Sequence, residues 1–106
     1  MSDTPTPEAI FTSVQSSFAG RLDVKLASGP SDAPMLKAAG TSFAMLYGGQ
    51  LVVHLHPGRC AELVDIGKGS LLVLDGETLP DWFAVDGIDA AEWTAHTMEA
   101  LAWAKG

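Results

Sequence analysis

This sequence has little cysteine, little basic charge and no long apolar run, and each scarcity narrows what the chain can be. Cys60 is the single cysteine, so no disulfide can form within the chain, which favours a reducing setting. No apolar run approaches the roughly 18–20 residues needed to cross a bilayer. The polar start, residues 1–7, lacks the basic and apolar segments of a signal peptide. We therefore expect a cytoplasmic protein that makes no membrane contact.

Basic residues are strongly outnumbered, since thirteen acids face six bases and the formal net charge is −7. The imbalance is concentrated between residues 62 and 104, where nine acids accompany one base, Lys68. An acidic surface of this kind repels phosphates and anionic lipids. The six bases are scattered along the sequence and form no basic stripe. We interpret the charge as serving solubility and expect no tight nucleic-acid binding at physiological salt.

Apolar residues are plentiful enough for one core. The chain is 47% hydrophobic, which is typical of a globular domain. Its 106 residues suffice for one core and are too few for two. The first residues are polar and contain proline. We therefore expect a disordered tail at residues 1–6 and one domain at residues 7–106.

Capping signals and apolar periodicity predict three helices. The first follows the N-cap Thr6 and ends near Gly20, the second covers residues 57–66, and the third begins at Asp89. Five strands are expected at residues 21–27, 41–47, 50–56, 71–74 and 82–85, with a loop at 28–34. The order α-β-β-β-α-β-β-α, with three helices against one mainly antiparallel sheet, predicts a two-layer α+β sandwich.

A glycine pair, Gly48-Gly49, sets the register at the centre of the sheet, because a tight primed turn needs positive φ angles. This register pairs Leu46 with Leu51 on one face and Phe43 with His54 on the other. One face is expected to pack under the helices: Ala44, Leu46, Leu51, Val53 and Leu55, with Phe11, Val14, Leu63 and Leu101. The other face is expected to have no partner within the chain: Phe43, Met45, Tyr47, Val52 and His54.

Four parts of the chain carry a family resemblance. Residues 42–46 (SFAML), residues 51–55 (LVVHL), the short helix after Pro57 and residues 76–85, which end in DWFAV, resemble the MmcQ/YjbR family and the related N-terminal domain of TfoX-type proteins. The resemblance covers roughly residues 35–105. It implies a compact YjbR-like α+β fold, a role in nucleic-acid binding and no catalytic residues.

Three positions differ from the pattern of that family. His54 and Pro80 stand where the family pattern has lysine, and Glu77 stands where it has arginine. Each change removes a positive charge that a nucleic acid would contact. We therefore expect the fold to be shared and the nucleic-acid role to be weaker.

The spacing of the histidines and the position of the cysteine give only weak signals for metal binding or thiol catalysis. His54 and His56 share one side of a strand, a spacing that binds a metal only when a third ligand arrives. The side chain of His96 is expected to point into the core instead. Cys60 lies near a helix start, where a thiol pKa can fall, but it also fits a small core position. We expect no metal site, no cofactor and no catalytic residue.

Tryptophans divide into two groups. Trp93 and Trp103 lie on the apolar stripe of the last helix and are expected in the core. Trp82 follows Pro80 among acidic residues and is left as a candidate for a surface contact.

Our leading hypothesis from the sequence is a non-catalytic interaction domain, monomeric or homodimeric, that binds a protein or a small ligand through the uncovered sheet face. The expected surface consists of Phe43, Met45, Tyr47, Val52, His54 and Trp82. The alternative, from the resemblance, is a nucleic-acid-binding regulator of transcription or competence. A third alternative is a metal- or thiol-dependent enzyme.

Overall fold

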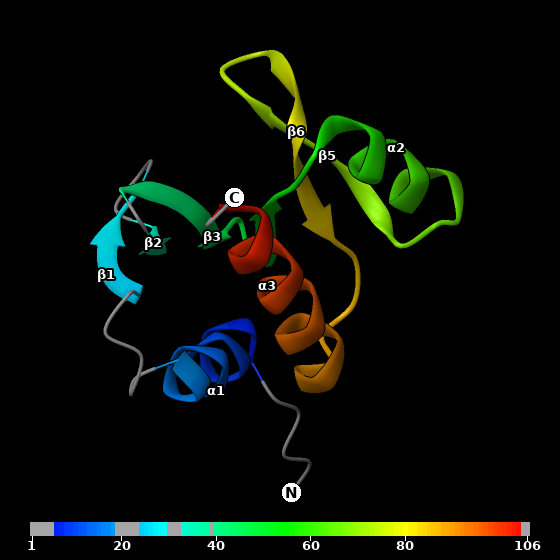
Figure 1. Ribbon diagram of the computed structural model, residues 1–106. Coiled ribbons are helices and arrows are strands. Elements are labelled where there is room, and N and C mark those ends of the chain that lie inside the picture. The colour runs from blue at the N-terminus through cyan, green and yellow to red at the C-terminus, as the bar shows by residue number, and fades with distance from the viewer. Residues whose placement is uncertain (1–5, 19–23, 30–32, 39, 105–106) are drawn as a thin grey trace, which may run out of the picture.

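Three helices and a six-stranded sheet make up the computed structural model, which describes residues 6–18, 24–29, 33–38 and 40–104 (Figure 1). The helices are α1 (Pro7–Phe18), α2 (Pro57–Asp65) and α3 (Ala90–Ala104). The strands are β1 (Val24–Ser28), β2 (Pro34–Ala38), β3 (Thr41–Tyr47), β4 (Gln50–His54), β5 (Gly69–Leu74) and β6 (Glu77–Val85). The sheet order is β1-β2-β3-β4-β6-β5, and every neighbouring pair is antiparallel.

The predicted α+β class is confirmed, with one strand more than expected. β2 occupies residues that we had expected partly as loop, because its apolar pair Met35 and Leu36 hides the period-two signal of a strand. Met35 is buried on one face of the sheet and Leu36 on the other. Predictions for residues 1–5, for Gly20 and for the start of the first strand lie outside the described residues.

The register set by Gly48-Gly49 is confirmed. Both glycines have positive φ, 61° and 78°, and Leu46 pairs with Leu51 across the turn. All three helices pack on the face that this register selects. We call the resulting cluster the helix-side core: Phe11, Val14, Phe18, Leu36, Ala38, Phe43, Ala44, Leu46, Leu51, Val53, Leu55, Cys60, Leu63, Phe83, Val85, Trp93, Ala100 and Leu101. It contains every residue that we expected under the helices.

Phe43 is a correction. We expected it opposite His54 on the uncovered face, but it lies fully buried in the helix-side core, with its ring 6.2 Å from that of Phe18. The cause is a β-bulge. Leu36 of β2 pairs with Ala44, but the next residue of β2 pairs with Ser42, so Phe43 is the extra residue of β3. A bulge turns one side chain to the opposite face, and local periodicity does not reveal it.

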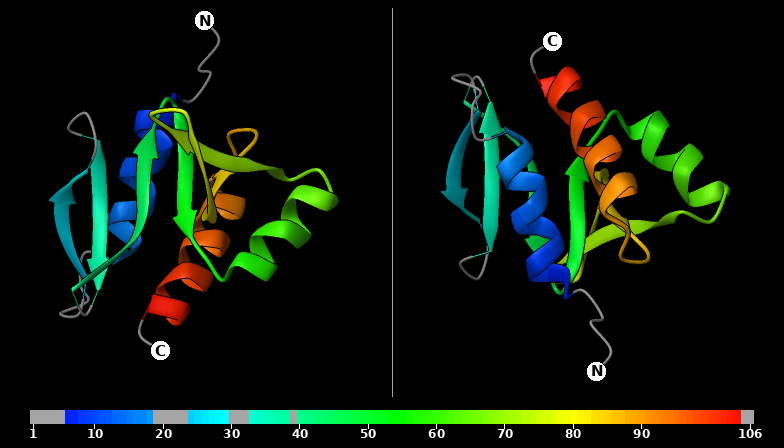
Figure 2. Two further views of the ribbon diagram at one scale, coloured as in Figure 1. Left: turned by 90° about the horizontal axis from the view of Figure 1, so that it is seen from above. Right: turned by 90° about the horizontal axis from the view of Figure 1, so that it is seen from below.

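The second face of the sheet also has a buried cluster, which we call the open-side cluster: Met35, Met45, Val52, Leu72 and Ala84. Among the described residues no helix contributes to it. Side chains of the same sheet cover it instead: Ala27, Tyr47, Leu74, Leu79 and Trp82. Figure 2 shows how strongly the strand direction turns from β1 to β5, and such a twisted sheet brings side chains on one face together. We expected Met45 and Val52 on an uncovered face, but both are buried.

Candidate functional site

A distortion in β6 shapes the site. Pro80 has no N–H to donate to a ladder, so it is tolerated in a sheet only at an edge or a bulge. Leu71 of β5 pairs with Phe83 of β6, but the next residue of β5 pairs with Leu79, so the register of β6 skips three residues. Asp81 and Trp82 lie within this jump. Bulges commonly redirect side chains, and here the distortion presents both of these residues beside the end of β4.

His54, the last residue of β4, contacts both of them. It lies opposite Trp82 in the ladder, and its Nε2 is 2.8 Å from Oδ2 of Asp81. Because an ionised carboxylate only accepts hydrogen bonds, Nε2 carries the proton and donates it. The other ring nitrogen, Nδ1, is buried and has no hydrogen-bond partner among the described residues.

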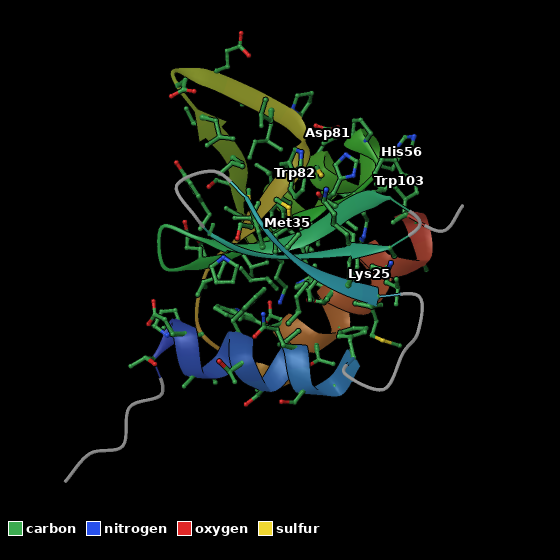
Figure 3. All side chains as sticks on the ribbon, turned by 90° about the vertical axis from the view of Figure 1, so that its left-hand side faces the viewer. Lys25, Met35, His56, Asp81, Trp82 and Trp103 are labelled. Carbon is green, nitrogen blue, oxygen red and sulfur yellow. The ribbon has the colours of Figure 1, made fainter. Side chains whose placement is uncertain are left out.

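Two tryptophans enclose the His54 ring. The ring centroid of Trp82 is 4.7 Å away with an interplanar angle of 31°, and that of Trp103 is 4.7 Å away with an angle of 61°. Trp103 also approaches His56, at 6.3 Å between centroids. We call Trp82, Trp103, His54 and Asp81 the tryptophan cluster, and its position at one end of the sheet can be followed in Figure 3.

Trp103 is a second correction. We expected it in the core, but its side chain is 39% exposed. It lies in the last turn of α3, which brings it beside His54 and His56 at the end of β4 and not among the buried residues of the helix-side core. Trp93 is in the core as expected, and its Nε1 donates a hydrogen bond to the carbonyl oxygen of Gly87.

Two helical carboxylates, Glu62 of α2 and Glu99 of α3, meet Arg59. Glu99 lies one turn before Trp103 on α3 and accepts two hydrogen bonds from Arg59, at 2.8 and 3.3 Å. Glu62 lies 3.6 Å from the same guanidinium. The hydrogen bond to Glu99 raises the pKa of Arg59. Together with Asp81, three carboxylates therefore stand against one guanidinium, and the neighbourhood is electronegative.

His56 has a structural role. It is the N-cap of α2, and its Nδ1 accepts a hydrogen bond from the backbone N–H of Gly58, at 3.0 Å. Such a cap satisfies a backbone donor that the helix itself cannot pair. The two histidines that we considered as metal ligands are thus engaged separately, His54 by Asp81 and His56 by its helix.

Cys60 is buried on the inner side of α2, as the core interpretation predicted. Burial raises the pKa of its thiol, the hydrogen bond to the Leu55 carbonyl opposes this, and the charges of Asp81 and Glu99 raise the pKa further. The thiol therefore stays protonated at neutral pH, and the protonated form is the poor nucleophile.

His96 is buried, as expected, with its ring 6.3 Å from that of Phe83. Its Nε2 lies 3.6 Å from Glu92, beyond hydrogen-bond distance. In the described part of the chain, no three His, Cys, Asp or Glu side chains are grouped as metal ligands would be. No helix within the same described ranges combines the length and the apolar character needed to cross a membrane.

Of the six residues expected to form an interaction surface, only His54 and Trp82 belong to the tryptophan cluster, whereas Met45, Val52 and Tyr47 lie with Trp82 in or against the open-side cluster. Phe43, Met45 and Val52 are buried, and Tyr47 is half-buried beside the open-side cluster. Asp81 and Trp103 complete the tryptophan cluster and were not expected there. The neighbouring Pro80 was the available signal for Asp81, because proline inside a strand pattern indicates a bulge.

No protein-family model, curated protein or solved structure matches the chain. The resemblance to the MmcQ/YjbR family thus stays a prediction from the residues quoted for it.

Proposed function

We propose that this protein is a non-catalytic interaction domain that binds a cationic group of a partner, such as a lysine or arginine side chain, through the tryptophan cluster. The observation that carries the proposal is the exposed Trp103, which lies against the ring of His54, the partner of the Asp81 carboxylate. An exposed tryptophan beside carboxylates attracts cations through its ring and through charge.

Charge complementarity supports a cationic partner over an anionic one. The net charge of the chain is −7, Asp81 belongs to the cluster, and Glu99 lies one turn before Trp103 on α3. Arg59 neutralises only part of this charge, because it serves two carboxylates at once. A basic segment would therefore be attracted over long range and held at the tryptophans.

The state of the candidate reactive groups supports a binding role. His54 engages Asp81 through Nε2, and its Nδ1 is buried, so neither ring nitrogen is presented for proton transfer. Cys60 is buried, and its raised pKa disfavours the thiolate. Both groups that an enzyme could have used here serve packing instead.

The nucleic-acid alternative has less support in the placement of the bases. Arg59 is occupied by Glu99, and α2, which carries it, lies on the opposite side of the molecule from β1, which carries Lys25 (Figures 1 and 2). Phosphate binding depends on several bases acting together. In a shift assay at about 150 mM salt we expect affinity no tighter than the ~10⁻⁴–10⁻⁶ M non-specific range. Nanomolar, steeply salt-dependent binding would instead favour the nucleic-acid regulator.

The test is a titration with a short peptide of alternating arginine and glycine whose two termini are capped. Binding is monitored through the tryptophan indole N–H signals in nuclear magnetic resonance spectra. We expect Trp103 and Trp82 to shift and Trp93, which is buried, to stay unchanged. Trp103→Ala should weaken binding by about 2- to 30-fold, the range of one cation–π contact. The matched control is Met98→Ala, an exposed apolar residue on the outer side of α3, which should leave the affinity unchanged.

A peptide of alternating glutamate and glycine should cause no shift at these indoles. Equal binding of both peptides, or full affinity in Trp103→Ala, would contradict the proposal. Because Trp103 is only partly buried, its replacement is expected to leave the fold intact, and far-ultraviolet circular dichroism verifies this.

A further inference from the structure

At the other side of the sheet, β1 presents an edge without a partner. It pairs with β2 and, among the described residues, with no further strand. Alternate N–H and C=O groups of such an edge point outward and can pair with an added strand. This edge is distant from the tryptophan cluster, which involves β4, β6 and α3.

A hollow of about 280 Å³ lies beside this edge, between α1 and β1. α1 packs against α3, β3 and β4, and the hollow is lined by residues of α1, β1 and β2. Its lining is apolar at Phe18, Val24, Leu26 and Leu36, and polar at Thr12, Gln15 and Ser16 of α1.

Leu26 is the feature that this hollow leaves unexplained. It lies on the helix-facing side of the sheet, opposite the buried Leu36. It is nevertheless 69% exposed. A large aliphatic side chain on an open edge, next to an apolar hollow, is an incomplete contact that a further side chain would complete.

Charge on the other side of the same edge indicates what that further strand carries. Lys25 of β1 and Lys37 of β2 are register partners on one face, and like charges directly opposite each other are destabilising. Within the described ranges neither lysine forms an ion pair. An acidic residue opposite Lys25 would relieve this repulsion.

We propose that β1 binds an extended segment of a partner protein in which aliphatic and acidic residues alternate. The segment adds a strand to the sheet at β1. Its residue opposite Leu26 lies on the helix-facing side and enters the hollow, and its residue opposite Lys25 lies on the other side and is acidic. The alternation of the partner thus matches the two faces of the edge.

A second copy of this chain fits the same edge less well. Pairing β1 with itself would bring two further lysines, the partner's Lys25 and Lys37, to the face that already carries Lys25 and Lys37. This local accumulation of positive charge opposes that occupant.

The experiment uses the full chain and a capped synthetic peptide in which leucine and glutamate alternate. Binding should shift and protect the backbone amides of β1, with amide exchange slowed by about tenfold or more once most of the protein is bound. A peptide N-methylated at every residue, which has no amide hydrogen to donate from either edge, should not bind. A peptide with lysine in place of glutamate should bind about tenfold more weakly, the effect of losing a favourable charge pairing.

Two variants of the protein locate the contact. Leu26→Glu places a charge at the hollow and should reduce affinity by about tenfold or more. Its matched control is Val73→Glu, which changes an exposed apolar residue on the opposite edge strand, β5, and should change affinity less than twofold. Lys25→Glu should lower the preference for the glutamate peptide over the lysine peptide, a readout that a folding defect would not produce.

Several outcomes would overturn the proposal. They are the absence of peptide binding up to about millimolar concentration, full affinity in Leu26→Glu, and binding of the N-methylated peptide. Shifts confined to Trp82 and Trp103 would place the peptide at the other site. Concentration-dependent dimerisation that Leu26→Glu removes, without peptide binding, would show that a second copy occupies the edge. Failure of the arginine peptide at the tryptophan cluster would leave this proposal intact.

Discussion

On one face of the sheet, Leu51 and Val53 lie beneath helices, whereas on the other face Met45 and Val52 lie beneath side chains of the sheet itself. Both pairs are buried to a similar extent. The helix-side core joins all three helices to the sheet, and the open-side cluster involves strands alone. Burial therefore identifies a cluster but not the layer that covers it.

The difference matters for the site. The helices close the first face, so its residues serve stability. The second face has no helical layer in the described structure, and its covering side chains include Trp82, which also stacks on His54. The candidate site is thus continuous with the smaller of the two clusters, and the two faces should respond differently to substitution.

The largest effect is expected on the helix side. Leu51→Ala should lower the free energy of unfolding by about 2–5 kcal/mol, toward the upper end, because rigid helices prevent the cavity from collapsing. Urea unfolding followed by circular dichroism measures this loss. A loss below about 0.5 kcal/mol would contradict the register that places Leu51 under the helices.

A smaller loss is expected on the open side. Met45→Ala removes a side chain of similar size that is equally buried, but the side chains covering it belong to strands and can move inward. We expect about 2 kcal/mol, the low end of the range for such changes. The same urea experiment compares the two variants. A loss equal to that of Leu51→Ala would show that the two clusters are equally rigid.

Sequence reasoning succeeded where a local signal controls structure. Gly48-Gly49 determined the hairpin register, and Thr6 caps α1 as expected, with its Oγ1 accepting a hydrogen bond from the N–H of Ala9. Asp89 likewise caps α3 through the N–H of Glu92. Each cap joins residues three positions apart, and the hairpin turn joins two consecutive strands, so the local sequence carries these contacts directly.

Long-range features were missed for the same reason. The bulge at Phe43 depends on how β3 meets β2, and no pattern within β3 records it. The pair His54 and Asp81 joins residues 27 positions apart. The exposure of Trp103 depends on where α3 ends relative to the sheet, which its helical periodicity does not encode. The sequence therefore did not show that Asp81 and Trp103, half of the tryptophan cluster, lie beside His54.

A pH-dependent effect distinguishes the helix side further, because Cys60 lies within that core. Burial raises the pKa of its thiol in the folded state, so the unfolded chain loses its proton first as pH rises. The stability contributed by the neutral thiol is complete below about pH 8.5 and declines above it, by at most about 1.4 kcal/mol per pH unit. Urea unfolding at several pH values measures the decline.

The control for this effect is Cys60→Ala. The variant should be less stable by a constant amount at low pH because of its small cavity, and the difference between the two proteins should shrink above about pH 8.5. Parallel curves up to about pH 10 would mean that the Cys60 thiol titrates alike in both states.

The smallest effect is expected at the rim of the tryptophan cluster, where Arg59 meets Glu99. Both side chains are more than one-third exposed, so solvent screens their attraction, and exposed pairs contribute about 0.2–1 kcal/mol. Glu99→Gln should lower the free energy of unfolding within this range, and the loss should fade in about 1 M salt. Glu62→Gln, at a longer 3.6 Å and more exposed, is the matched control and should have almost no effect. A loss above about 2 kcal/mol for Glu99→Gln that salt leaves unchanged would mean that the pair is part of the buried structure, and the rim could then not serve as an accessible surface for a cationic partner.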